Sequence, residues 1–269
     1  MRVLSIALLS LINDWQSGNG NFSAESLSEL EREALTLDEE FRRCEQSPHF
    51  HKTSLTVDPS ADFFGRTWVK LLGRDGCCLP AAGWTTRRAV AERHKVMDAS
   101  RDDARFGLIV ERIPGQNEII INLDRLYASG AIDDAVASYA EDEFSDGIRS
   151  IGNSEHEVIL RPCTFTPNDI WAMRNPAQEF QDFLAVFDTA FNEPEENGTE
   201  IETLWDRIEQ AGLRGQHAAW LEGNHARVVL VHVLAAIRQR HPEFAGRLID
   251  PADIRLDRPG GSLTVIPVK

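Results

Sequence analysis

The segment from Ala24 to Gln46 constrains the fold of this chain most, because its apolar residues recur at a helical spacing. Successive apolar positions alternate between separations of three and four residues, namely Leu27, Leu30, Ala34, Leu37, Phe41 and Cys44. Charged residues occupy the positions between them. Ser23 precedes the segment and supplies a hydroxyl that can cap the first backbone amides. The pattern predicts a single amphipathic helix over Ala24 to Gln46 with one apolar face.

Two interpretations of this apolar face remain open. In the first, the helix packs its apolar face against the rest of its own domain. In the second, Leu30, Leu37 and Phe41 present the face to a protein partner or to a second copy of the chain. The heptad-like spacing covers about two and a half heptads, short of the three to four that a coiled coil needs. The second interpretation supplies the functional hypothesis below.

The other periodic segments predict helices and strands in an irregular order. The apolar run from Val3 to Ile12 predicts a buried first helix; after Arg2 it also resembles a secretory signal, but no A-x-A cleavage site follows. This run is too short to span a bilayer. Alternating or β-rich runs predict strands over His49 to Val57, Phe106 to Ile113, Glu118 to Leu123 and Glu157 to Thr164. Pro114-Gly115 suits a type II turn and predicts that the second and third of these strands form a hairpin.

These segments predict an α+β fold that is mainly helical, with a small, largely antiparallel sheet built from hairpins. The acidic stretch Asn192 to Thr199 carries Pro and Asn-Gly and is the best candidate for a linker. The expected organisation is therefore an α+β domain over residues 1–192 and a helical C-terminal region over residues 199–269. That region is expected to end in a β-hairpin that turns at Arg258 to Gly261. Packing of both regions as one domain stays open.

Charge and cysteine usage narrow the class of protein. The formal net charge is −15, from 43 acidic and 28 basic residues, which disfavours binding to nucleic acid. The four cysteines, Cys44, Cys77, Cys78 and Cys163, include no CxxC pair, so a zinc ribbon and a thioredoxin motif are excluded. Free thiols in a reducing compartment are the simpler interpretation. We expect a cytoplasmic protein without a membrane segment.

His49 and His51 are the candidate metal ligands. Residues two apart on a strand point to the same face, so both imidazoles could hold one zinc or other divalent ion together with a third ligand. The alternatives are exposed strand histidines and acid–base use. No cofactor is otherwise predicted.

Cys78 is the candidate nucleophile, because it lies in a loop before a predicted helix that begins at Thr85 or Thr86. A thiolate close to a helix N-terminus is activated. A histidine base such as His94 or His156 would have to converge on it. The alternative is that the adjacent thiols of Cys77 and Cys78 are inert.

Walker A, GxGxxG, HExxH, GxSxG, EF-hand and kinase signatures are absent from the sequence. Together with the heptad-like segment and the acidic composition, this favours a non-enzymatic protein–protein interaction subunit of a cytosolic assembly. Such a subunit is expected to bind a protein partner or to self-associate. The alternative is a metal-assisted hydrolase or a thiol enzyme whose site is assembled from scattered residues, so whether the chain is an enzyme stays open.

Overall fold

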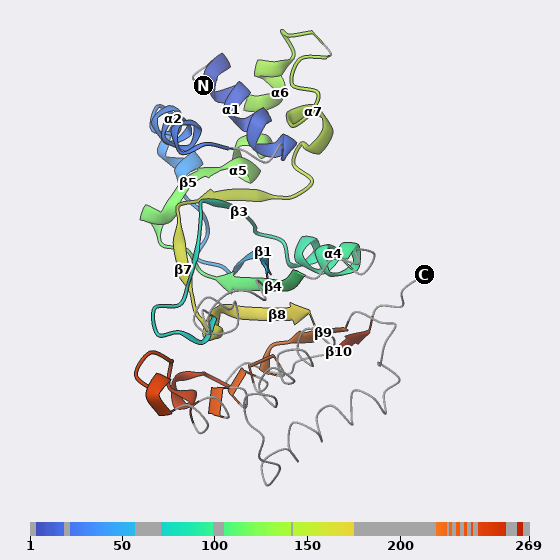
Figure 1. Cartoon of the computed structure of the whole chain (residues 1–269). Helices are drawn as coiled ribbons and strands as arrows, with labels where there is room; N and C mark the ends of the chain where they lie inside the picture. The colour runs from blue at the N-terminus through green and yellow to red at the C-terminus, as the bar shows by residue number, and fades with distance from the viewer. Residues whose placement is uncertain are drawn as a thin grey trace. The chain divides into compact units, whose positions relative to one another are not determined.

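The chain forms two compact units in the computed structural model (Figure 1). The first unit comprises Met1–His51, Leu79–Ala91 and Arg112–Cys163, and the second comprises Lys52–Cys78, Glu92–Glu111 and Thr164–Lys269. The structure describes residues 4–18, 22–56, 71–98, 105–140, 142–174, 219–224, 226–227, 230–231, 234–235, 238, 242–256 and 263–265. The predicted linker Asn192 to Thr199 lies outside these residues, so the division into residues 1–192 and 199–269 stays a prediction.

The first unit places helices on one side of antiparallel strands (Figure 1). Its strands are adjacent in the order β1, β3, β6, β5, and every neighbouring pair is antiparallel; only His49–His51 of β1 belong to this unit. The strand bounds are β1 His49–Thr56, β3 Ala82–Thr85, β5 Ile119–Asn122 and β6 Glu157–Leu160. The helix bounds are α1 Ile6–Ser17, α2 Ala24–Ala34, η1 Glu39–Arg42, η2 Gln116–Glu118, α5 Leu123–Ala128, α6 Ala131–Val136 and α7 Ile148–Ile151. A further helix, α4 Arg88–Asp98, begins in this unit and continues into the second.

The predicted first helix is confirmed as α1. Ser5 caps it by accepting a hydrogen bond from the backbone amide of Leu8 at 3.1 Å. Gly18 ends it with a φ of 63°, a left-handed conformation that glycine adopts without steric cost. The buried side of the helix carries Leu8, Leu9, Leu11 and Ile12. Within the described part of the chain, no helix is both long and apolar enough to cross a membrane.

The predicted helix over Ala24 to Gln46 is shorter in the structure. Ser23 caps α2 as expected, accepting from the Ser26 amide at 3.0 Å, but α2 ends at Ala34. At that end the Thr36 hydroxyl donates to the Glu33 carbonyl, and the Leu37 amide donates to the Ala34 carbonyl. These bonds tighten the last turn and stop the α-helix, because they use carbonyls that a continuing helix would need. The chain then forms the short helix η1.

A single apolar cluster joins the helices and strands of the first unit. It contains buried side chains from α1, α2, α5, α6 and α7 and from the strands β5 and β6. Leu30, Ala34 and Phe41 belong to it, and Leu27 and Leu37 pack against it from partly buried positions. The apolar residues of the predicted amphipathic helix therefore remain on one side even though the helix is interrupted.

Gly147 marks a close backbone approach between α1 and the start of α7. The Asn13 side chain accepts hydrogen bonds from the amides of Gly147 and Ile148 at 3.0 and 3.2 Å. A Cβ on Gly147 would lie 2.1 Å from the Asn13 carbonyl oxygen.

We therefore expect Gly147→Ala to lower the free energy of unfolding of the first unit by about 1–3 kcal/mol, because the two backbones must separate. Urea unfolding monitored by tryptophan fluorescence measures the change. Gly246→Ala is the control, since nothing lies within 4 Å of a Cβ built there. Equal stabilities of the two variants would contradict this expectation.

The second unit is built on antiparallel strands in the order β4, β8, β9, β10. Their bounds are β4 Arg105–Arg112, β8 Ile170–Arg174, β9 Ala219–Glu222 and β10 Leu263–Val265. Three short helices accompany them, η3 Pro167–Asp169, η4 Pro242–Phe244 and η5 Pro251–Asp253. The strands β2 Cys77–Leu79 and β7 Cys163–Phe165 form a separate two-stranded sheet. Trp220 and Arg227 are fully buried, and Arg227 donates to the carbonyls of Arg255 and Asn168.

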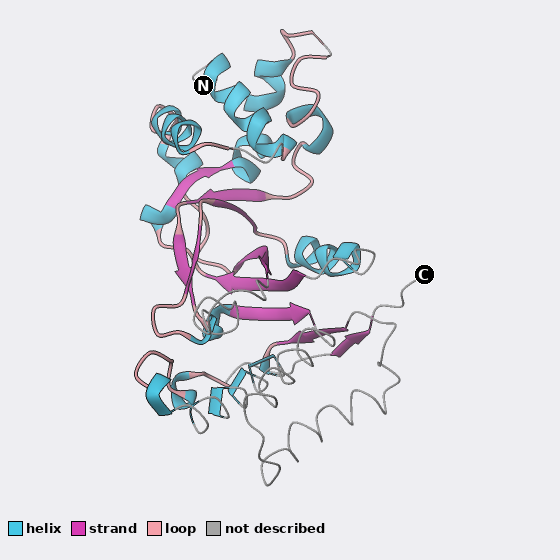
Figure 2. Cartoon of the chain, in the orientation of Figure 1, coloured by secondary structure: helices cyan, strands magenta, loops and turns pink. Residues whose placement is uncertain are grey.

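The expectation of a mainly helical chain with a small sheet built from hairpins is wrong. Helix accounts for 44% and strand for 23% of the described residues, and only six α-helices are present there (Figure 2). The first unit holds β3, β5, β6 and the start of β1, and the second holds β8, β9, β10, most of β4 and the rest of β1. The fold is α+β and the described strand pairs are antiparallel, as expected, but the chain is not mainly helical and the sheet is not small.

The hairpin expected around Pro114-Gly115 does not form, because β4 pairs with β8 and β5 pairs with β6. Gly115 has a φ of −71° and a ψ of 153°, whereas the third residue of a type II turn needs a positive φ. The Glu118 carboxylate accepts from the Gly115 amide at 2.7 Å and caps η2, so the chain continues instead of reversing. At the C-terminal end, β10 likewise pairs with β9, not with the residues before Arg258.

Candidate functional site

The residues predicted to contact a partner lie inside the first unit. Leu30 is fully buried and Phe41 is buried, and both belong to the core cluster. Leu37 is partly buried against the same cluster. The structure therefore supports the first interpretation of the apolar face, in which it packs on its own domain.

The two candidate metal ligands occupy different surroundings at the start of β1. His49 is fully buried, with its Nδ1 2.8 Å from the Ser47 carbonyl oxygen. Its Nε2 is buried and has no hydrogen-bond partner among the described residues. The Nδ1 of His51 lies 2.8 Å from the Gly83 carbonyl oxygen, and its ring lies 5.2 Å from that of Trp84. Because a carbonyl only accepts, each Nδ1 carries the hydrogen.

Burial lowers the pKa of His49, because it penalises the charged imidazolium. A neutral imidazole with a lone pair on Nε2 is the form that binds a metal ion. However, the described residues contain no group of three or more His, Cys, Asp or Glu side chains that could hold one. The metal site on His49 and His51 stays a prediction without a third ligand.

The described part of the structure does not bring a histidine base to Cys78, the candidate nucleophile. Cys78 is exposed on β2, and its Sγ lies 3.9 Å from the Thr164 hydroxyl. His94 lies on α4, where the backbone alone is described. His156, the second histidine considered as a base, is engaged by a carboxylate of the first unit.

That carboxylate belongs to Asp124. The register of the strands explains why Asp124 and His156 lie side by side. In the antiparallel pair β5–β6, Asn122 lies opposite Val158. Two residues beyond Asn122 comes Asp124, in the first turn of α5, and two residues before Val158 comes His156. On the other side of β6, the Thr86 amide donates to the His156 carbonyl at 3.1 Å. Three neighbouring strand ends thus converge.

The Asp124 carboxylate is held by three side chains. Its Oδ1 lies 2.9 Å from the His156 Nδ1 and accepts from the Asn153 Nδ2 at 2.9 Å. Its Oδ2 accepts from the Thr86 hydroxyl at 3.3 Å. These contacts fix the orientation of the carboxylate and, through it, of the imidazole ring.

The electrostatics of this group favour an ionised Asp124. Partial burial by itself raises the pKa of Asp124. The hydrogen bonds from His156 and Asn153, with the positive charges of His156 and Arg87, outweigh burial and lower the pKa. The carboxylate is therefore charged at neutral pH.

The backbone of His156 adopts a left-handed conformation, with a φ of 49°. This conformation is uncommon for a residue other than glycine and costs energy that surrounding contacts must offset. Here the His156 amide donates to the Asn153 carbonyl at 3.2 Å, and the His156 carbonyl accepts from Thr86. The ring is held toward Asp124 at the expense of local backbone strain.

Glu157, next to His156, is partly buried and contacts α1 through Trp15. Its Oε1 accepts from the Trp15 Nε1 at 2.8 Å. A Cβ on Gly83 would lie 1.6 Å from this oxygen, so the carboxyl occupies space that the glycine leaves empty. Burial raises the pKa of Glu157 to about 7, and the hydrogen bond from Trp15 opposes this rise.

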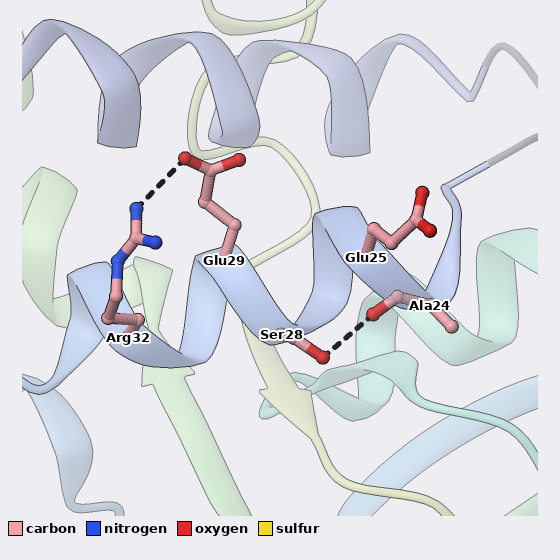
Figure 3. Close-up of a pocket in the computed structure, with 5 residues that line it drawn as sticks. All are labelled: Ala24, Glu25, Ser28, Glu29 and Arg32. Carbon is pink, nitrogen blue, oxygen red and sulfur yellow. Dashed lines mark hydrogen bonds and ion pairs between the residues drawn. The ribbon is translucent and has the colours of Figure 1, made fainter.

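A shallow groove of about 580 Å³ runs along the outer face of α2 (Figure 3). Three of its four polar side chains already have a partner within α2. Arg32 pairs with Glu29 at 2.9 Å, and the Ser28 hydroxyl donates to the Ala24 carbonyl at 2.9 Å. Only the carboxylate of Glu25 is left without such a contact in Figure 3, so the groove offers little to a ligand.

The sequence did not reveal the group around Asp124. In the sequence, His156 is a candidate base for Cys78 and Thr86 a candidate helix start, but Asp124 and Asn153 belong to no recognisable motif. Asp124 and His156 lie 32 positions apart, and no short motif connects them. Correct pairing of β5 with β6 is the one signal that could have found them.

Comparisons of the chain with protein-family models, curated proteins and solved structures gave no match.

Proposed function

We propose that the protein is an enzyme in which His156 acts as a general base, oriented by Asp124. The observation that carries this proposal is the 2.9 Å contact between the His156 Nδ1 and the Asp124 Oδ1. A carboxylate only accepts, so Nδ1 carries the hydrogen and the lone pair of the neutral ring lies on Nε2.

The chemistry follows from this tautomer. His156 Nε2 takes a proton from water or from a substrate hydroxyl, and the charged Asp124 stabilises the imidazolium that forms. The His156 side chain is 33% exposed, so the ring is within reach of solvent. This mechanism belongs to the class of enzymes whose sites are assembled from scattered residues, and it needs neither the thiol of Cys78 nor a metal on His49 and His51.

We expect His156→Gln to lower the rate of hydrolysis by about 100- to 10,000-fold, because it removes the base. Asp124→Asn should lower the rate as well, since it removes the charge that stabilises the imidazolium. A panel of small ester, amide and phosphodiester substrates, tested on the full chain, measures the effect.

His51→Gln is the matched control, because the His51 Nδ1 also donates a hydrogen bond, but to the Gly83 backbone carbonyl. It should keep the wild-type rate. Hydrolysis that is equally fast in the His156→Gln variant would contradict the proposal, as would the absence of turnover across the whole panel.

The second candidate function is that of an interaction subunit in a cytosolic assembly. Exposed apolar residues other than Leu30, Leu37 and Phe41 favour it. Ile6 and Leu35 are 53% and 63% exposed, unlike the buried Leu30 and Phe41. The Ser5 hydroxyl donates to the Glu33 carboxylate at 2.7 Å, which brings the start of α1 to the end of α2. Ile6 and Leu35 follow these two residues closely in sequence, and we propose that they contribute to one small apolar patch.

In this second function, a protein partner or a second copy of the chain covers the Ile6–Leu35 patch. Affinity purification of the tagged chain, with light-scattering mass on the eluate, should then give a particle heavier than 30.2 kDa. Leu35→Asp should return it to the monomer mass. A wild-type chain that elutes as a partner-free monomer would count against the interaction function and leave the acid–base proposal untouched.

A further inference from the structure

The helix α7 lies beside α1, and two side chains of α1 hold its two ends (Figure 1). At the start of α7, the Asn13 Oδ1 accepts from the backbone amides of Gly147 and Ile148 at 3.0 and 3.2 Å. At its end, the Gln16 Nε2 donates to the Gly152 carbonyl at 3.0 Å. Asn13 and Gln16 are three residues apart, so they lie on the same face of α1. The position of α7 is therefore set from α1.

The Gln16 side chain is itself held in place. Its Oε1 accepts from the Tyr127 hydroxyl of α5 at 2.7 Å. Because the Gly152 carbonyl only accepts, the NH2 end of the Gln16 amide must face it. Gly152 has a φ of 55° and a ψ of −138°, a conformation that residues other than glycine rarely adopt. The turn after α7 thus depends on a glycine and on the hydrogen bond from Gln16.

This turn carries Asn153, which contacts both members of the acid–base pair. The Asn153 Nδ2 donates to the Asp124 Oδ1 at 2.9 Å. The Asn153 carbonyl accepts from the His156 amide at 3.2 Å. One planar peptide unit joins Gly152 to Asn153, so a shift of the Gly152 carbonyl moves both contacts.

We propose that Gln16 is a positioning residue of the acid–base site, because its bond to Gly152 fixes the turn from which Asn153 holds Asp124 and His156 together. The inference deepens the proposed function and rests on it for the role of His156 as the base. Gln16 makes its hydrogen bonds to Gly152 and Tyr127, so it acts on the pair through the backbone of the turn. The two residues Gln16 and Gly152 lie 136 positions apart in the chain.

The test is a double-mutant cycle on the full chain with Gln16→Met and Asn153→Ala. Its readout is the rate at which the His156 Nδ1 proton exchanges with solvent, followed by NMR at neutral pH. This proton exchanges only when its contact with Asp124 opens, so a looser carboxylate speeds the exchange. Gln16→Met, which has a similar length but no donor, should speed it by about fivefold or more, as the loss of one typical hydrogen bond would. Asn153→Ala should do the same.

The two substitutions should not add. In the Asn153→Ala background, Gln16→Met should leave the exchange rate almost unchanged, because the contact through which Gln16 acts is already absent. Ser17→Ala is the matched control on α1, since the Ser17 hydroxyl donates within the same helix, to the Asp14 carbonyl at 2.9 Å. Gln16→Glu keeps the acceptor for Tyr127 and loses the donor, so it replaces Gln16→Met in the cycle if that variant does not fold.

On any substrate that the wild type hydrolyses, Gln16→Met should lower kcat by about tenfold or more and change KM by less than about twofold, because Gln16 positions the base and binds no substrate. Exchange that is unchanged in Gln16→Met, equally fast in Ser17→Ala or additive with Asn153→Ala would overturn the inference. If no substrate of the panel is hydrolysed, the proposed function fails. The exchange measurement needs no turnover and still decides whether Gln16 positions the pair.

Discussion

Leu30→Asp is expected to unfold the first unit. Leu30 is fully buried in the cluster that joins α1, α2 and the strands. The substitution removes a buried leucine and places a carboxyl group where it has no hydrogen-bond partner, which costs at least about 4 kcal/mol. Because small domains are stable by only about 5–15 kcal/mol, this loss removes most of the stability of the unit. Urea unfolding followed by circular dichroism measures it.

Leu35→Asp is the matched control for that experiment. Leu35 lies five residues further along and is 63% exposed, so the same chemical change there should alter stability by less than about 1 kcal/mol. If Leu30→Asp folds normally and instead loses a partner, the apolar face of α2 is a docking surface and its burial in the core is wrong. The comparison thus decides between the two interpretations of the pattern over Ala24 to Gln46.

Glu157→Gln is expected to stabilise the first unit at pH 8. The pKa of Glu157 is raised to about 7, so the folded state holds its proton more tightly than the unfolded state, whose carboxyl titrates near 4.5. Between these two values, stability falls as the pH rises, and above pH 7 the full cost is present. Glutamine has the same shape and stays neutral, so it should raise the free energy of unfolding at pH 8 by about 1–3 kcal/mol.

The two forms should be almost equally stable at pH 4, where Glu157 is protonated in both the folded and unfolded states. The Trp15 indole donates a hydrogen bond to this carboxyl, which lowers its pKa, and the negative charge of Glu155 raises the pKa. Glu143→Gln is the control, because Glu143 is exposed and its substitution should leave the pH dependence unchanged. A Glu157→Gln variant whose stability falls between pH 4.5 and 7 as steeply as that of the wild type would show that another group causes the dependence.

Element boundaries set by local chemistry were predictable. Ser23 predicts the start of α2, and the apolar run that ends at Ile12 predicts α1. Both are local signals, because a cap and an apolar helix face involve residues only a few positions apart. The β-rich runs likewise predicted the strand segments β1, β4, β5 and β6. The end of α2 at Ala34 was missed, since its closing bonds compete with a helical pattern that continues unbroken in the sequence.

Local sequence patterns of this kind could not predict the candidate site. The contact between Trp15 and Glu157 spans 142 positions, and the contact between His156 and Asp124 spans 32. Both depend on β6 lying between β3 and β5, and Pro114-Gly115 wrongly suggested another partner for β5.

The sequence by itself determined the net charge, the caps and the strand-forming segments, because these depend on residue type and near neighbours. Only the tertiary structure decided which strands pair, that the stripe of α2 is internal, and that Asp124 orients His156. Pairing and burial are properties of residues far apart in the chain, and their free energies depend on the whole packed unit.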